Sequence, residues 1–209
     1  MKYMSILGGN FSGKIGNLVF YTYRSEQFCR LAPGKRSKPD TPAQKAWQEV
    51  FKTSGVLLRP LAEVLRLGLI HKNSEKGRWL SVASKNLLNK AVYKRADDYF
   101  LDYSRIELSK GSLWTADTKV YALNQELRFC WRFFSAVNSY AGDLAVLLAY
   151  NKNRQRWVYT IGQFKRADEA AVLKLPCSAS TEDYEVYMFF FNAERKTASR
   201  TAYLGKVAV

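Results

Sequence analysis

Residues 118–134 read TKVYALNQELRFCWRFF, and this stretch decides the fold because it holds two short strand-like runs joined by a turn. In the second run every other side chain is large and apolar, with Arg or Cys between them. The apolar set is Leu127, Phe129, Trp131 and Phe133. Side chains of a β-strand point alternately to opposite faces, so this pattern is typical of a strand with one buried face. We therefore expect Trp131 to lie in a core between two sheets.

Similar runs fill the last hundred residues of the chain, with turns between them and no helical pattern. The complete set is Thr118–Leu123, Leu127–Phe134, Leu144–Tyr150, Arg156–Ile161, Ala171–Leu175, Tyr184–Phe191 and Thr201–Val209. Seven short strands at this spacing predict an antiparallel β-sandwich over residues 111–209. Folds of this kind usually present surfaces to partners.

The run Tyr184–Phe191 differs from the others because it is apolar on both faces. One face carries Val186, Met188 and Phe190, and the other carries Tyr187, Phe189 and Phe191. A strand of this kind must be covered on both sides. The opposite sheet covers one side. We expect the chain's own helices to cover the other, and the alternative is a partner protein, which makes Tyr187, Phe189 and Phe191 candidate partner contacts.

Residues 1–110 carry a different pattern, which predicts an N-terminal arm, a β-hairpin and helices. The arm is rich in glycine, and Leu18–Tyr23 and Gln27–Leu31 read as the two strands of the hairpin. A basic linker follows over residues 33–40. The segment 41–44, Thr-Pro-Ala-Gln, combines a capping Thr, a Pro at the first helical position and a Gln three residues after the cap. Together with the sandwich, this organisation predicts an α+β protein with parts 1–110 and 111–209.

Three helical stretches are expected in this first part. They cover Pro42–Ser54, Leu57–Leu69 with a break at its proline, and Leu80–Val92. Residues that the first helix is expected to bury are Ala43, Trp47, Val50 and Phe51. We then expect a short acidic connection over Asp97–Asp102 and a strand over Tyr103–Leu108.

The composition limits the classes of protein to consider. The chain has 33 Lys or Arg and 18 Asp or Glu, a net charge of +15 that is densest in the first 60 residues. Such a charge favours nucleic acid, anionic lipid or an acidic protein face as partner. Three widely spaced cysteines and one histidine suggest neither a disulfide framework nor a zinc site, so we expect no metal and no cofactor. We see no apolar run of membrane-spanning length and no secretion signal, and expect synthesis in the cytoplasm.

Catalytic or cofactor-binding motifs are weak. Residues 8–14, Gly-Gly-Asn-Phe-Ser-Gly-Lys, match the start of a phosphate-binding loop. However, Ile15 stands where Ser or Thr would hold magnesium, and a strand follows instead of a helix. We prefer the interpretation of a glycine-rich arm. Weaker candidates are a lone His71, the adjacent Asp97 and Asp98, and a sugar- or anion-binding turn with Arg154, Arg156 and Trp157.

Basic and aromatic residues are interleaved along the hairpin and the linker. The basic residues are Arg24, Arg30, Lys35, Arg36 and Lys38, and the aromatic residues are Phe20, Tyr21, Tyr23 and Phe28. Cations can hold phosphates while aromatic rings stack on bases, so nucleic-acid binding is one interpretation. The four aromatic side chains equally suit contact with another protein.

An ordered set of motifs spans nearly the whole chain. It comprises Ile6–Gly9, Ser12–Asn17, Thr41–Gln44, Leu101–Ser104, Ser109–Leu113 and Tyr203–Val207. With this set the chain resembles a family of uncharacterised bacterial proteins described as a domain of unknown function. The resemblance implies an N-terminal arm and helices followed by an immunoglobulin-like or fibronectin-like sandwich, and it supplies no activity. Glycine-rich arms before such a capped helix also resemble segments of some phage-encoded proteins.

These observations favour a structural or assembly protein without enzymatic activity, for example a component of a virion or another large particle. Its arm would contact neighbouring subunits through the four aromatic residues of the hairpin. The alternative is a basic nucleic-acid-binding protein that uses the five basic residues of the hairpin and linker.

Overall fold

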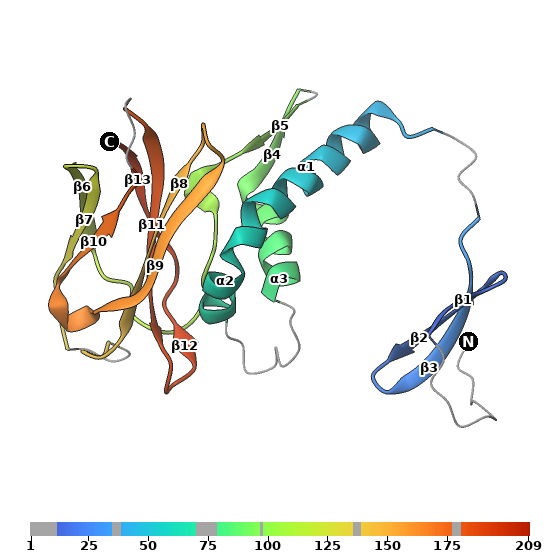
Figure 1. Cartoon of the computed structure of the whole chain (residues 1–209), viewed down its shortest axis with the longest axis horizontal. Coiled ribbons are helices and arrows are strands. Elements are labelled where there is room, and N and C mark those ends of the chain that lie inside the picture. Colours follow the sequence, from blue (N-terminus) through green and yellow to red (C-terminus); the bar gives the residue numbers. More distant parts are fainter. Residues whose placement is uncertain (1–11, 35–38, 70–78, 97, 136–138, 177–180) are drawn as a thin grey trace. The chain divides into compact units, whose positions relative to one another are not determined.

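The computed structural model describes residues 12–34, 39–69, 79–96, 98–135, 139–176 and 181–209 (Figure 1). Contacts within the chain divide it into two compact units, Met1–Thr41 and Pro42–Val209. The expected boundary at residue 110 therefore does not separate two compact units, because the helices before it belong to the same unit as the sandwich. We describe each unit by itself.

The first unit contains a three-stranded antiparallel sheet, here called the N-terminal sheet. Its strands are β1 (Gly13–Ile15), β2 (Leu18–Tyr23) and β3 (Glu26–Leu31), in the order β1-β2-β3. Arg24 and Ser25 connect β2 to β3 with φ values of 50° and 66°. Positive φ at both residues of a two-residue loop is the geometry that suits the right-handed twist of a hairpin. The predicted hairpin is confirmed, with β1 as an additional strand.

The second unit begins with helices. They are α1 (Pro42–Leu58), the 3₁₀ turn η1 (Arg59–Leu61), α2 (Ala62–Gly68), α3 (Trp79–Asn86) and the π-helical turn η2 (Leu87–Ala91). Helix α1 begins at Pro42, as the capping pattern predicts. The expected break at the proline is confirmed, because Pro60 lies in η1, where a residue without a backbone N–H ends the regular α-helix.

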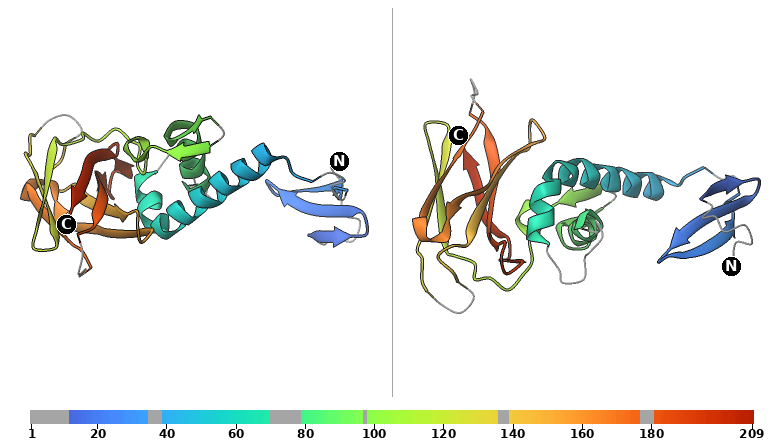
Figure 2. Two further views of the ribbon diagram at one scale, coloured as in Figure 1. Left: turned by 90° about the horizontal axis from the view of Figure 1, so that it is seen from above. Right: turned by 60° about the horizontal axis from the view of Figure 1, so that its bottom comes forward.

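The predicted burial along α1 is wrong for most of the helix. Trp47 and Phe51 are exposed, and the buried residues are Ser54, Leu57 and Leu58. The first turns of α1 extend beyond the sheet that the last turn covers (Figure 2). An apolar stripe therefore does not identify which end of a long helix reaches the core.

A second hairpin follows the helices, where the sequence suggested a helix end and an acidic connection. Its strands are β4 (Val92–Arg95) and β5 (Asp98–Leu101). The strand expected over Tyr103–Leu108 is also wrong, since residues 103–105 form the 3₁₀ turn η3. The Asp102 carboxylate accepts a hydrogen bond from the backbone N–H of Ser104 at 3.0 Å, and this cap favours a turn over an extended strand.

All seven predicted strands of the C-terminal part are confirmed. They are β6 (Thr118–Leu123), β7 (Glu126–Trp131), β8 (Leu144–Asn151), β9 (Arg156–Lys165), β10 (Ala170–Lys174), β11 (Asp183–Asn192) and β13 (Ala202–Ala208), with the short β12 (Thr197–Ala198) in addition. One antiparallel sheet has the order β10-β7-β6. In the other, β8 lies between β9 and β11, and β11 also pairs with β12 and β13. The fold is thus α+β with antiparallel C-terminal sheets, and its immunoglobulin-like or fibronectin-like type stays a prediction.

Strand β11 joins two hydrophobic cores, one on each of its faces. Val186, Met188 and Phe190 lie in the core between the two sheets, which also holds Leu127, Phe129 and Trp131. On the other face, Tyr187, Phe189 and Phe191 pack with the helices. The prediction that the chain's own helices cover this face is confirmed. These three residues are at most 5% exposed, which corrects their selection as partner contacts.

Candidate functional site

The N-terminal sheet positions most of the residues that the sequence suggests for partner or nucleic-acid contact. Directly paired residues of antiparallel strands lie on the same face of the sheet. Tyr21 pairs with Phe28, and Val19 pairs with Arg30. The structure therefore brings Tyr21, Tyr23 and Phe28 together on one face, which we call the aromatic face.

Aromatic contacts and cations organise this face. The rings of Tyr21 and Phe28 stack with 5.7 Å between centroids, and Tyr23 meets Phe28 edge-on at 6.5 Å. The Arg24 guanidinium lies 5.3 Å from the centroid of the Tyr23 ring, and the Arg30 guanidinium lies 6.0 Å from that of Tyr21. Cations at these distances are attracted by the ring quadrupole. The aromatic face thus combines planar rings with positive charge.

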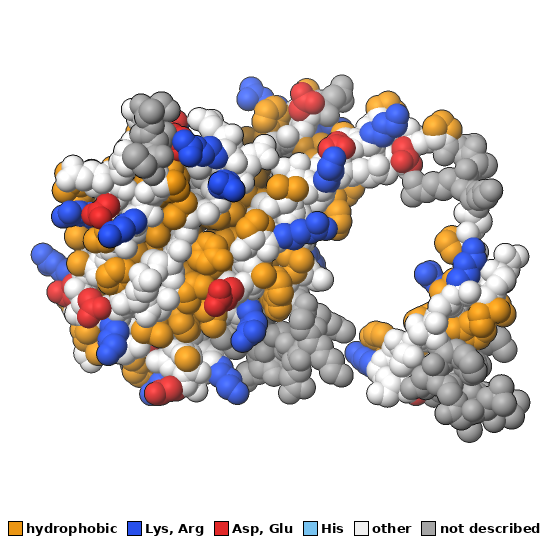
Figure 3. Space-filling model, viewed as in Figure 1, with side chains coloured by type: hydrophobic (Ala, Val, Ile, Leu, Met, Phe, Trp, Pro, Cys, Tyr) orange, Lys and Arg blue, Asp and Glu red, His pale blue; other side chains and the backbone are white. Residues whose placement is uncertain are grey.

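The opposite face carries aliphatic side chains, and we call it the aliphatic face. Ile15 pairs with Leu18, and Leu18 pairs with Leu31, so the three residues form one row across all three strands. They are 64%, 40% and 74% exposed, respectively. Phe20 lies on this face, half-buried, and not with the other three predicted aromatic residues. Hydrophobic side chains gather on the N-terminal sheet in Figure 3.

This aliphatic row was not identified from the sequence, although a signal for it exists. The two-residue turn at Arg24 and Ser25 fixes the register of β2 against β3, and Leu18 is then opposite Leu31. The strand β1 could not be placed in the same way, because its three residues carry too little alternation. Three strands of three, six and six residues also cannot enclose a core on both faces.

Several other predicted residues fall outside the described part of the chain. These are Lys35, Arg36, Lys38, His71, Asp97 and most of the glycine-rich segment 8–14. The predicted sugar- or anion-binding turn lies within the described part of the chain, but two of its side chains contact other parts of the protein. The Trp157 indole N–H donates to the backbone carbonyl of Leu57 at 2.8 Å, and Arg154 pairs with the Glu182 carboxylate. These contacts give both side chains structural roles.

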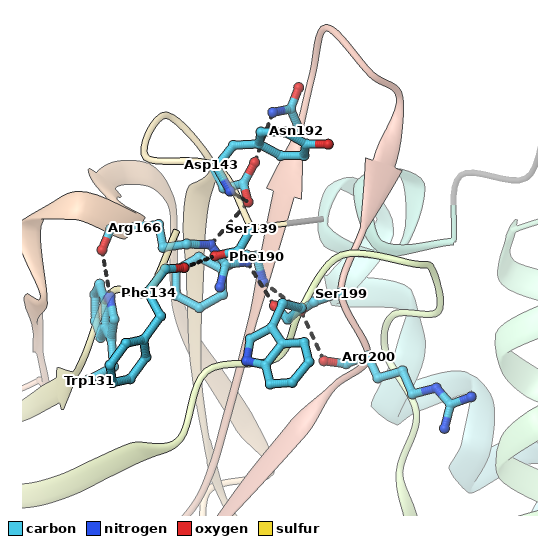
Figure 4. A network of polar contacts seen from close by, with 11 residues as sticks. Trp131, Phe134, Ser139, Asp143, Arg166, Phe190, Asn192, Ser199 and Arg200 are labelled. Carbon is cyan, nitrogen blue, oxygen red and sulfur yellow. Dashed lines mark hydrogen bonds and ion pairs between the residues drawn. The ribbon is translucent and has the colours of Figure 1, made fainter. Parts of the chain in front are cut away.

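The most deeply buried charges of the second unit lie at one end of the sandwich (Figure 4). Arg166 Nε donates to Asp143 Oδ2 at 3.0 Å, and Asn192 donates to Asp143 Oδ1 at 2.8 Å. Arg166 Nη2 donates to the carbonyl of Trp114 at 2.8 Å. Burial lowers the pKa of Arg166, and the neighbouring Asp143 carboxylate opposes that shift. Because these groups satisfy each other, the network is built to hold the sheets together.

The structure also bears on metal binding and on membrane insertion. Among the residues it describes, no three or more His, Cys, Asp or Glu side chains are grouped so that they could hold a metal ion. No helix in the same residues is long and apolar enough to cross a membrane. The exposed faces of the N-terminal sheet are thus the best-supported candidate site.

Comparison with known proteins identifies a matching sequence family. The sequence model described as "Family of unknown function (DUF6266)" matches residues 10–205, which is nearly the whole chain and includes the N-terminal sheet. No curated protein matches the chain.

Proposed function

The chain belongs to this family of unknown function, and we propose that it is a non-enzymatic structural or assembly protein whose N-terminal sheet contacts another protein subunit. The observation that carries the proposal is the aliphatic row of Ile15, Leu18 and Leu31. Large aliphatic side chains are usually buried, and each contributes roughly 1.5–3 kcal/mol when it leaves water. A row of three exposed ones across a small sheet is best explained by a protein contact.

One edge of the N-terminal sheet supports the same function. Within the described residues, strand β1 pairs only with β2. Unpaired backbone N–H and C=O groups of an edge strand can add a strand from another chain, and the side chains then supply specificity. A neighbouring subunit could thus be held by backbone pairing at an edge and by the aliphatic row on one face.

We propose a large particle, such as a virion, as the setting of this contact. The division into a small sheet and a larger unit of helices and sheets suits an assembly in which the small unit contacts a neighbouring subunit. Repeated use of one such contact between identical chains generates rings or extended arrays.

Substitutions on the two faces of the N-terminal sheet test the proposed contact. Ile15→Thr with Leu31→Thr keeps strand propensity but removes most of the aliphatic row, and Lys14→Thr is the matched control on the aromatic face. We expect light scattering to show loss of self-association, or a pull-down to show loss of a bound protein, only in the double variant. An unchanged thermal transition would show that the body still folds. Wild-type protein that neither self-associates nor retains a partner would overturn the proposal.

Nucleic-acid binding is a second candidate, because cations and rings share the aromatic face. Single-stranded nucleic acid is bound by stacking bases on aromatic rings beside positive charges. Arg24→Ser with Arg30→Ser should then weaken binding and lower the salt slope by about 0.7 per lost phosphate contact. Arg200→Ser, at an exposed arginine of the second unit, is the control. Fluorescence anisotropy across a salt series measures the effect, and wild-type protein that binds no strand at low salt excludes this candidate.

A further inference from the structure

Helices α1 and α3 lie side by side in the second unit (Figure 2). Their side chains line a groove of about 510 Å³, with α1 and η1 on one side and α3 and η2 on the other. All of these residues belong to the second unit, so an inference about the groove does not depend on the function proposed for the N-terminal sheet.

The α1 wall is one continuous stripe. Trp47, Phe51, Gly55 and Arg59 line the groove at spacings of four residues, which places them on the same side of a helix. Phe51 is 59% exposed and Trp47 is 42% exposed. These are the two residues that the sequence suggested would be buried. The Trp47 ring also packs against Tyr99 of β5, with 5.4 Å between the centroids, so only part of its surface faces the groove. More than half of the Phe51 side chain stays exposed along the groove.

The α3 wall has matching spacing. Leu80, Ser84 and Leu88 line the groove four residues apart, with apolar side chains at the two ends and a small one between them. Gly55 is also small and lies in the middle of the opposite wall. A Cβ atom added there would make only an ordinary contact, at 3.8 Å from Arg59 Nε. The middle of the groove is thus open enough for a close approach by another segment.

The charged side chains that line the groove are basic. Arg59 and Lys85 are the charged side chains among the described residues that line the groove, and no Asp or Glu is present there. Within the described part of the chain, neither of the two forms an ion pair with a carboxylate. An occupant that brings carboxylates would supply the missing partners.

We propose that this groove binds an acidic amphipathic helix of a partner protein. Two neighbouring helices with side chains four residues apart form ridges and a channel into which a third helix packs. From Trp47 in α1 to Arg59 in η1 the channel is about 18 Å long, the length of some three helical turns. The bound helix places its apolar stripe on Trp47, Phe51 and Leu88 and its Asp or Glu side chains against Arg59 and Lys85, as in other helix-in-groove complexes.

A pair of labelled peptides tests both the shape and the charge of the proposed occupant. Each has about 18 residues, with Leu at heptad positions a and d and Ala at b, c and f. The acidic peptide has Glu at e and g, and the basic peptide has Lys there. Fluorescence anisotropy with the full chain should show the acidic peptide binding at least about tenfold more tightly than the basic one.

Three variants assign the binding to this groove. Ser84→Trp fills its middle, and Phe51→Ala removes the largest exposed contact, so each should abolish or strongly weaken binding of the acidic peptide. Lys52→Ala is the control, since Lys52 follows Phe51 on α1, is 73% exposed and does not line the groove. Arg59→Glu with Lys85→Glu should reverse the preference, so that the basic peptide binds better.

Three results would overturn the proposal. The first is that the acidic peptide does not bind, and the second is that both peptides bind equally well. The third is that the wild-type chain self-associates in light scattering and the Ser84→Trp variant does not. That result would place a second copy of the chain in the groove. Circular dichroism of each variant confirms that the body has folded, and Phe51→Ala keeps the test decisive if Ser84→Trp does not fold.

Discussion

The Arg166 guanidinium and the Asp143 carboxylate form an ion pair in which the two side chains are only 1% and 0% exposed. The Arg166 guanidinium carbon also lies 3.8 Å from the centre of the Phe190 ring, and Phe190 belongs to β11, which pairs with β8 in the larger sheet. The backbone N–H of Arg166 donates to the carbonyl of Asp143 at 2.7 Å. One charged side chain thus links the loop before β8, the turn after β9 and the centre of the sandwich.

Breaking this pair from one side should destabilise the protein severely. Arg166→Met leaves the Asp143 carboxylate buried without its cation, and losses of about 3–5 kcal/mol are typical of that situation. Urea denaturation measures the change. The double variant Arg166→Met with Asp143→Leu removes both charges and should be less destabilised than Arg166→Met alone. If the single variant lost less than about 1 kcal/mol, the pair would not hold the sandwich together.

The Trp131 side chain should be equally important for the sandwich core. It is 4% exposed, its ring meets Phe190 edge-on at 5.5 Å, and its indole N–H donates to the carbonyl of Arg166 at 2.7 Å. Trp131→Ala leaves a large cavity and should cost about 3–5 kcal/mol. Trp131→Phe keeps much of the ring volume but loses the hydrogen bond, so it should cost less. Equal urea midpoints for wild type and Trp131→Ala would contradict this packing.

The strands of the sandwich could be predicted because each carries its own evidence. Leu127, Phe129 and Trp131 alternate with polar or small neighbours, and β11 shows by its two apolar faces that it lies between two layers. In a strand with one buried face, apolar side chains occur at every second position, and this alternation can be read from a few residues of a single sequence. The position of each strand therefore follows from local pattern alone.

The helices and the site depend on relationships that a local pattern does not contain. Trp47 and Phe51 form an apolar stripe, yet both are exposed, and the buried residues of α1 all lie near its C-terminal end. The aliphatic row arises from three strands, and Ile15 joins it only because β1 pairs with β2. Strand pairing and the extent of a neighbouring surface are set by tertiary structure. The exposed stripe of α1 and the aliphatic row could therefore be recognised only in the structure.

Tyrosine ionisation should weaken the protein at alkaline pH. Burial raises the pKa of Tyr150 to about 12, and burial together with the hydrogen bond to Glu185 raises the pKa of Tyr203 to about 12, from an ordinary value of 10.0. The folded state keeps these protons at pH values where the unfolded chain releases them. Stability from these groups is therefore fully present below pH 10 and is lost as the pH rises from 10 to 12.

Urea denaturation at about pH 9 and pH 11 measures this dependence. Tyr150→Phe and Tyr203→Phe should each reduce the loss of stability between the two pH values, because a phenylalanine has no proton to release. Tyr121→Phe is a suitable control, since Tyr121 is 48% exposed. A pH dependence that neither core variant alters would mean that other groups cause the alkaline transition.

Removal of residues 1–41 should separate assembly from folding. The contacts of the chain divide at Thr41, and both hydrophobic cores are built from residues after it. The truncated chain keeps the helices, both sheets and the Arg166–Asp143 pair, so its thermal midpoint should stay within about 2 °C of the wild-type value. Light scattering or a pull-down should show that self-association, or retention of a partner protein, is lost. A truncated chain that unfolds or aggregates would mean that the N-terminal sheet stabilises the body. A truncated chain that still assembles fully would move the contact to the second unit, where the groove between α1 and α3 is the first surface to test.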